Sequence, residues 1–159
     1  MIACSNLENS KLLQNKGVFH FFIENFDNYN SASKETVVFT FKNLIHKMNL
    51  DLIIYLINEC KIIELFLNIL RKEEFSKTLI FDTIFCMFDI FISGLIIENT
   101  VLEKITYIRF HQLGGEEILN EFLIKVKNHE LFTNANSLKT IFLQIKEKFN
   151  NEYYKQIDC

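Results

Sequence analysis

Cysteine and histidine are the residue types in this sequence best suited to chemistry, and their spacing argues against a reactive site. There are four of each: Cys4, Cys60, Cys86 and Cys159, and His20, His46, His111 and His129. None of them shows the short, paired separations of zinc ligands. The sequence also contains no Gly-rich phosphate loop, Gly-x-Ser-x-Gly elbow or His-Glu-x-x-His motif. We therefore expect no metal, no cofactor and no enzymatic activity.

One cysteine could in principle form a nucleophile pair with a distant histidine. Cys86 lies at the centre of residues 84–88, which read IFCMF. A nucleophilic cysteine must ionise, and apolar surroundings favour the neutral thiol instead. We therefore expect Cys86, like Cys60, to be an inert core residue.

Asp82 and Asp89 interrupt the most apolar stretch of the chain. Residues 79–97 read LIFDTIFCMFDIFISGLII, which approaches the length of a membrane-spanning helix. An aspartate at the centre of a bilayer costs about 3 kcal/mol, so a core helix with one polar stripe explains both acids better, and we expect no membrane partner. The stripe would be either the acidic wall of a groove or a solubilising face.

Phenylalanines recur with a helical period in the same stretch. Phe81, Phe85, Phe88 and Ile92 fall on one helical face. We expect this face to pack in the interior rather than to form a cofactor pocket. Truncation of Phe85 to alanine would then cost about 3–5 kcal/mol.

Composition and charge set the fold class and exclude one kind of partner. The chain has 159 residues, 49% hydrophobic and 23% charged, which suits one domain with its own core. It has no proline and only four glycines, so long helices are favoured over a turn-rich β fold. There are 17 basic and 20 acidic residues, a net charge of −3, which argues against a nucleic-acid partner.

A pattern of apolar residues recurs three times along the chain. The segments 17–26, 61–70 and 114–123 read GVFHFFIENF, KIIELFLNIL and GGEEILNEFL, with starts separated by 44 and 53 residues. Each segment follows a short apolar run. Each also precedes a longer amphipathic run, and these longer helices are expected at 34–48, 75–91 and 138–149.

The recurrence predicts three units of short helix, sharp turn, middle helix and long helix. Gly17 and Gly114 occupy the sharp turn, where glycine tolerates positive φ, and Lys61 takes that place in the second unit. Polar residues at 31–33 and 134–137 are expected to break the chain before the long helices. Such a unit cannot bury its apolar face alone, so three units stack on one continuous core. The boundaries are expected near 5–48, 49–98 and 100–151, within one domain spanning 1–159.

These segments resemble armadillo repeats, and in particular the C-terminal repeats of importin-α, the nuclear import adaptor. The turn Gly114-Gly115-Glu116-Glu117-Ile118 is similar to the one that opens the final importin-α repeat. Asn128-His129-Glu130 is similar to the polar break of that repeat, and the closing run 137–149 also resembles the family. The resemblance implies an all-α fold, a right-handed α-solenoid of about three three-helix repeats.

The resemblance also implies a peptide-binding site. The importin-α motif is Trp-x-x-x-Asn on the third helix of each repeat, and Phe39 and Asn43 keep that spacing with Phe in place of Trp. Together with Asp82 and Asp89 they form the candidate site for an extended basic peptide or a partner protein. The family implies a non-enzymatic protein-transport adaptor in the cytoplasm or nucleus.

Two other functions fit the same composition. One is a viral apoptosis-regulator (Bcl-like) helical bundle that binds an amphipathic helix in an apolar groove. The other is a structural subunit of a larger complex, which would show a large apolar patch on its outer surface. Phe39 itself is as well explained by core packing as by ligand binding.

Overall fold

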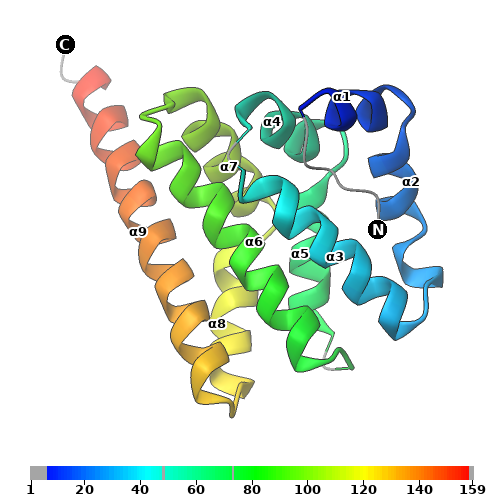
Figure 1. Cartoon of the computed structure of the whole chain (residues 1–159). Helices are drawn as coiled ribbons and strands as arrows, with labels where there is room; N and C mark the ends of the chain where they lie inside the picture. The colour runs from blue at the N-terminus through cyan, green and yellow to red at the C-terminus, as the bar shows by residue number, and fades with distance from the viewer. Residues whose placement is uncertain (1–6, 48, 73, 158–159) are drawn as a thin grey trace.

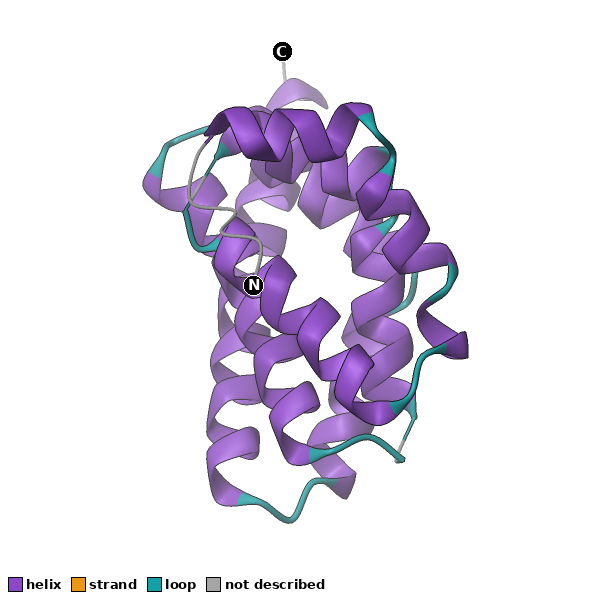
Figure 2. Ribbon diagram, turned by 45° about the vertical axis from the view of Figure 1, so that its right-hand side comes forward, coloured by secondary structure: helices purple, strands orange, loops and turns teal. Residues whose placement is uncertain are grey.

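The structure is a computed structural model that describes residues 7–47, 49–72 and 74–157, and all regular structure in these ranges is helical (Figures 1 and 2). The α-helices and one short 3-10 helix, in chain order, are α1 Leu7–Asn15, α2 Val18–Glu24, η1 Phe26–Asn28, α3 Ser31–Ile45, α4 Leu50–Asn58, α5 Ile62–Arg71, α6 Lys77–Ile96, α7 Thr100–Gln112, α8 Gly115–Lys125 and α9 His129–Ile157. The expected all-α fold class is confirmed.

Among the residues that the structure describes, five helices begin with the same side-chain cap. A polar side chain just before the helix accepts a hydrogen bond from the backbone N–H three residues on, as Asn49 does from Leu52 at 3.0 Å. The capping residues of α3, α4, α6, α7 and α9 are Asn30, Asn49, Ser76, Asn99 and Asn128. The starts of these helices are therefore fixed by a local side-chain cap.

The helices α2, α5 and α8 begin differently, at a residue in the left-handed conformation. The φ and ψ angles are 66° and 18° at Gly17, 59° and 40° at Lys61, and 67° and 33° at Gly114. The prediction that these three residues occupy equivalent turns is confirmed. At Gly115 the requirement for glycine comes from close packing, because a Cβ there would approach the Phe110 ring to 2.6 Å.

The helices pack in two layers. In Figure 1, α3, α6 and α9 lie side by side at the front, with α4, α5, α7 and α8 behind them. Helix α6 is central and contacts α3, α5, α7 and α9, while α4 packs on α7 and α5 on α8. The long helices α3, α6 and α9 thus pack in succession, and each helix of the second group contacts the corresponding helix of the third.

The core between the layers is aliphatic and aromatic. Its largest fully buried side chains are Phe19, Phe41, Phe66, Phe91, Phe110 and Phe142. Phe91 contacts the rings of Phe110 and Phe142, with centroids 5.2 and 6.2 Å away, so this cluster joins α6, α7 and α9. Cys60 and Cys86 are buried, as expected.

The predicted break at 134–137 is wrong. Helix α9 runs through it without interruption, because Ala135 and Leu138 continue its buried face. Hydroxyl groups at Thr133 and Ser137 donate to backbone carbonyls four residues earlier and so need no turn. The polar break lies at Asn128. Similarly, α3 begins at Ser31, because Asn30 is the cap and 31–33 are already helical.

The prediction that Phe85 is buried is also wrong. Its side chain is 37% exposed, whereas its neighbours Ile84 and Cys86 are buried. Helix α6 is apolar nearly all round, so periodicity alone did not identify the inward face. By length and composition α6 is also the one helix among the described residues that could cross a membrane, although 61% of its apolar window is buried inside the bundle.

Candidate protein-binding face on α3, α6 and α9

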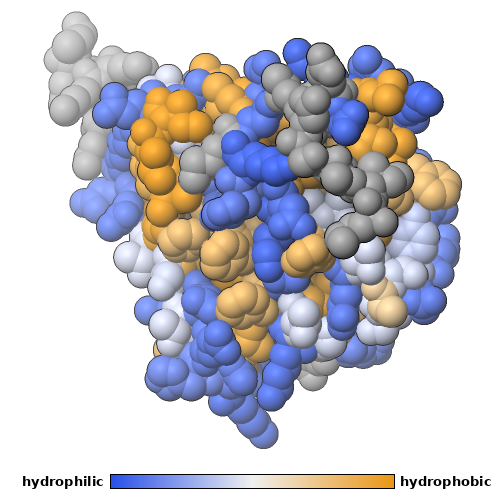
Figure 3. Space-filling model, viewed as in Figure 1, coloured by the Kyte–Doolittle hydropathy of each residue, from blue (hydrophilic) through white to orange (hydrophobic). Residues whose placement is uncertain are grey.

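Helix α6 carries a line of large apolar side chains, of which Phe85 and Ile96 are exposed and the other three are partly buried. We call Phe81, Phe85, Phe88, Ile92 and Ile96 the α6 stripe. Their spacing of three and four residues places them on one helical face, and exposure is 37% at Phe85 and 63% at Ile96. The rings of Phe81 and Phe85 stack at 6.1 Å. Figure 3, viewed onto this layer, shows hydrophobic surface between hydrophilic regions.

Lys42 of α3 reaches across to this stripe. Its ammonium lies 2.5 Å from the Asp82 carboxylate, 5.2 Å from the centre of the Phe39 ring and 5.9 Å from that of Phe85. Phe39 is 46% exposed. Two exposed rings and one buried carboxylate therefore surround a single cation, which is the arrangement of a cation–π site.

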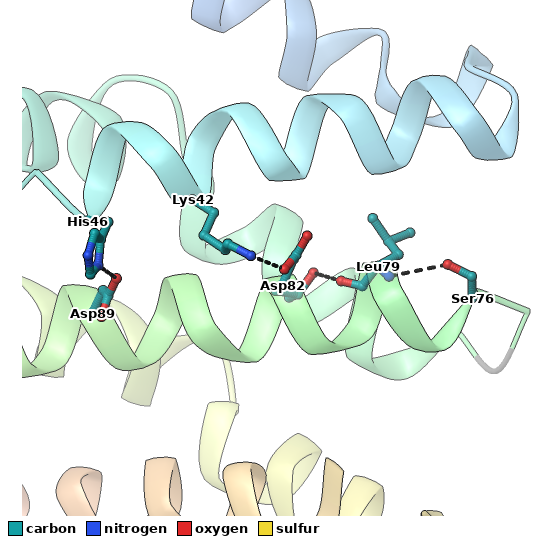
Figure 4. A network of polar contacts seen from close by, with 7 residues as sticks. Lys42, His46, Ser76, Leu79, Asp82 and Asp89 are labelled. Carbon is teal, nitrogen blue, oxygen red and sulfur yellow. Dashed lines mark hydrogen bonds and ion pairs between the residues drawn. The ribbon is translucent and has the colours of Figure 1, made fainter. Parts of the chain in front are cut away.

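Asp82 and Asp89 do not form a solvated acidic face, so the solubilising face, one of the two alternatives for these acids, is wrong. They are only 6% and 5% exposed and point from α6 towards α3 (Figure 4). Asp82 is paired with Lys42, and Asp89 lies 3.1 Å from Nδ1 of His46. Burial without these partners would be costly.

The polar pairs between α3 and α6 also define how the two helices run. Lys42 pairs with Asp82 and His46 with Asp89, and the Ser76 hydroxyl donates to the Glu35 carboxylate at the other end. Partners are 40, 43 and 41 residues apart and progress in the same direction along both helices. The helices are therefore parallel neighbours, displaced by about one recurrence of the sequence pattern.

The four candidate site residues are only partly brought together. Phe39 meets Asp82 through Lys42, while Asp89 lies two helical turns further along α6 and binds His46. Asn43 is exposed on α3, four residues after Phe39 and on the same side of the helix. The structure thus shows an aromatic and apolar face beside two buried acids that are paired with side chains of α3 and its C-cap.

A second polar cluster was not anticipated from the sequence. His20 of α2 joins the turn between α4 and α5: its Nε2 lies 3.1 Å from the carbonyl oxygen of Glu59, and its Nδ1 lies 3.1 Å from the Tyr55 hydroxyl and 3.6 Å from the Cys60 sulfur. A carbonyl only accepts, so Nε2 carries a hydrogen and donates to Glu59. Tyr55 and Cys60 are 35 and 40 residues from His20 in the sequence, so no local pattern indicates that these side chains meet.

The Cys60–His20 pair is the arrangement in the described chain that comes nearest to a nucleophile and base. It lines an open cavity of about 290 Å³. Burial raises the pKa of the Cys60 thiol, and burial raises that of Cys86 still further. Both sulfurs are therefore held as neutral thiols, which suits packing and not nucleophilic attack.

No protein-family model, curated protein or solved structure matches this chain.

Proposed function

We propose that this protein is a non-enzymatic, protein-binding adaptor built as a right-handed, armadillo-like solenoid of three repeats. The internal order of the chain supports the proposal. Within the described residues, three groups of helices share one order, and Gly17, Lys61 and Gly114 precede α2, α5 and α8 with similar left-handed angles. The third helices α3, α6 and α9 pack in succession, and α4 and α5 pack on α7 and α8. The parallel course of α3 and α6 is what translation by one repeat produces.

The observation that carries the binding role is the α6 stripe. Its exposed members, Phe85 and Ile96, are joined by partly buried apolar side chains, and apolar side chains gathered at a folded surface are typical of sites where another molecule binds. Aromatic residues such as Phe81 and Phe85 supply large contact area at interfaces. In armadillo-like repeats the third helices line the binding side, and α6 is the third helix of the middle group.

The importin-like form of this proposal concerns an extended basic peptide and a role in transport between cytoplasm and nucleus. Lys42 supports its chemistry, because an ammonium already sits between Phe39, Phe85 and Asp82. A lysine of a bound peptide would make the same contacts after displacing Lys42. Binding of a single basic motif to the unmodified chain would therefore be weak.

Titration calorimetry with a Lys/Arg-rich peptide tests the basic-peptide form. We expect weak binding by the wild type, tighter binding by Lys42→Met, in which the site is vacated, and loss of binding in Asn43→Ala and Asp82→Ala. Circular dichroism would establish that each variant is folded. Binding that is absent from both the wild type and Lys42→Met, or that is unchanged by the other two substitutions, would contradict this form.

A second form of the proposal has an amphipathic helix of a partner lying along the stripe. It is favoured by the length of the stripe, which spans four turns of α6. A photo-reactive amino acid placed at Phe85 would test either form in cells, with the same group at Ile108, an exposed residue of α7, as the matched control. We expect a protein crosslinked from position 85 and not from 108. Identical products from both positions would contradict a binding face on α6.

A further inference from the structure

A second surface, separate from the α6 stripe, lies where α5 and α8 end and α6 and α9 begin, at the lower end of Figure 1. It contains a cavity of about 480 Å³, within the range of ligand pockets. Its floor is apolar and comes from all four helices and the segment after α8: Leu70, Ile80, Ile118, Phe122, Val126 and Leu131. A bulky apolar group of another molecule would be desolvated there.

The rim of this cavity is basic although the whole chain is acidic. Arg71 and Lys72 lie on the α5 side and Lys125 and Lys127 on the α8 side, with Glu121 as the acidic residue that lines the cavity. Lys72 is paired with Asp27 at 2.7 Å. Arg71 and Lys127 are exposed, and neither forms an ion pair or side-chain hydrogen bond within the described part of the chain.

Helix-end electrostatics accounts for part of this pattern. Cations in the last turn of a helix are stabilised by the free carbonyls there, which explains Arg71 on α5 and Lys125 on α8. It does not explain Ile124, which stands beside them on the rim and is 85% exposed, the largest exposure among the large apolar side chains described. An apolar floor, an exposed apolar side chain and two unpaired cations together match a ligand that is both acidic and apolar.

We propose that this cavity binds a short acidic peptide segment of a partner protein that inserts one bulky apolar side chain. The cations stand on two sides of the opening, so several spaced carboxylates are engaged better than a single head group. The apolar side chain fills the floor, and Ile124 is covered by the peptide backbone or a neighbouring residue. This site is independent of the proposed role of the α6 stripe.

The test is a selection from a phage-displayed library of random peptides on the purified full chain. We expect enrichment of sequences that combine Asp or Glu with Phe or Leu. Synthetic peptides with these sequences should bind the Arg71→Glu/Lys127→Glu chain at least about tenfold more weakly than the wild type, a loss of about 1.4 kcal/mol. They should also bind the Ile124→Ser chain more weakly. A matched double reversal, Lys11→Glu/Lys104→Glu, changes net charge equally away from the cavity and should leave affinity unchanged.

Each other result overturns the proposal. These results are no enrichment, enrichment of basic or uncharged peptides, or affinities equally affected by both double reversals. Laurate tests the remaining alternative, in which the cavity is a site for an anionic amphiphile. That alternative would hold if laurate binds the chain, if Arg71→Glu/Lys127→Glu weakens laurate binding, and if the same substitutions leave the affinity of the selected peptides unchanged. A peptide affected by substitutions in the α6 stripe and not by those at the cavity would belong to the other face.

Discussion

Phe85 and Phe91 lie six residues apart on α6, and their surroundings predict very different contributions to stability. Phe91 is 2% exposed and contacts the Phe110 and Phe142 rings, whereas Phe85 is 37% exposed. We expect Phe91→Ala to lower the free energy of unfolding by about 3–5 kcal/mol, as truncation of a core phenylalanine does. Phe85→Ala should lower it by about 0.5–1 kcal/mol, in the range of surface changes. Urea denaturation of both variants measures the difference.

Equal losses for the two variants would contradict this assignment of inner and outer faces. A large loss at Phe85 alone would mean that the stripe is core, as its periodicity first indicated. The comparison is well matched, because both substitutions remove the same atoms from the same helix.

Tyr55 gives the structure a dependence on alkaline pH. Burial raises its pKa from 10.0 to about 12, and the hydrogen bond with Cys60 adds to the effect. The folded state therefore holds the phenol proton more tightly than the unfolded state. This stabilisation is complete below pH 10 and is lost as the pH rises towards 12. We expect the stability of the wild type to fall over this window relative to Tyr55→Phe, measured by urea denaturation at several pH values. Parallel curves would show that Tyr55 titrates normally.

At the level of residues, the sequence predicted burial better than it predicted partners. The core positions of Cys60 and Cys86 follow from apolar neighbours in the chain. The pairing of Asp82 with Lys42 and the bonds from His20 do not, because each partner lies 35 to 40 residues away. An aspartate in an apolar helix signals a compensating partner, but its identity requires the packing.

Among the elements, the turn before α5 offers a direct test of the recurrence. Lys61 has a φ of 59° where the equivalent residues are Gly17 and Gly114. A left-handed conformation costs a side-chain-bearing residue about 1–2 kcal/mol, so Lys61→Gly should raise the free energy of unfolding by about 1 kcal/mol. Lys61→Ala keeps the backbone cost and should change stability little. Thermal and urea denaturation measure both.

The reverse change at Gly17 isolates the same backbone cost. A Cβ at Gly17 would have no heavy atom within 4 Å outside its immediate neighbours, so Gly17→Ala introduces no clash. We expect a loss of about 1–2 kcal/mol from the left-handed φ alone. Stabilisation by this substitution would show that the turn can relax and that the three turns are not equivalent.

The register of α3 on α6 depends on their ion pairs. Lys42→Met leaves the buried Asp82 carboxylate unpaired and should cost about 2–3 kcal/mol, less than the roughly 3–5 kcal/mol of a fully buried pair because Lys42 is partly exposed. Adding Asp82→Asn should recover part of that loss. A double-mutant cycle would measure a coupling of about 1 kcal/mol or more. Additive losses would show that the two side chains do not interact in solution.

Helix existence was predictable from the sequence. The helix starts located correctly were those at the left-handed turns, whereas the two cap segments predicted before the long helices were misplaced. The left-handed turns before α2, α5 and α8 were located because the apolar pattern recurs there, with glycine at two of them and Lys61 at the other, whereas the left-handed conformation of Glu98 was not anticipated. The start of α9 was misplaced because residues 134–137 are polar yet helical, with Asn128 as the real cap. Polar residues on the outer side of a long helix resemble a break when only composition is considered.

On the scale of the whole molecule, the three groups of helices depend on one another for burial. Helix α6 is covered on one side by α3 and on the other by α7 and α9, and Phe91 lies in the second of these contacts. A charged link repeats this dependence, because the buried Asp82 of α6 binds Lys42 of α3 at 2.5 Å. Two neighbouring groups of helices without the remaining group would therefore leave one side of α6 uncovered.

A chain truncated after residue 98 tests this dependence. It keeps α1 to α6 but exposes the side of α6 that Phe110 and Phe142 cover, and stacked repeats draw their stability from such interfaces. We expect this fragment to lack a cooperative urea transition in far-UV circular dichroism.

A second, overlapping fragment, 49–159, keeps the Phe91 cluster but leaves Asp82 and Asp89 without their partners Lys42 and His46. It too should unfold at a lower urea concentration than the full chain. A fragment 1–98 that unfolds cooperatively and as late as the full chain would show instead that the groups fold independently, and the single continuous core on which the solenoid proposal depends would be contradicted.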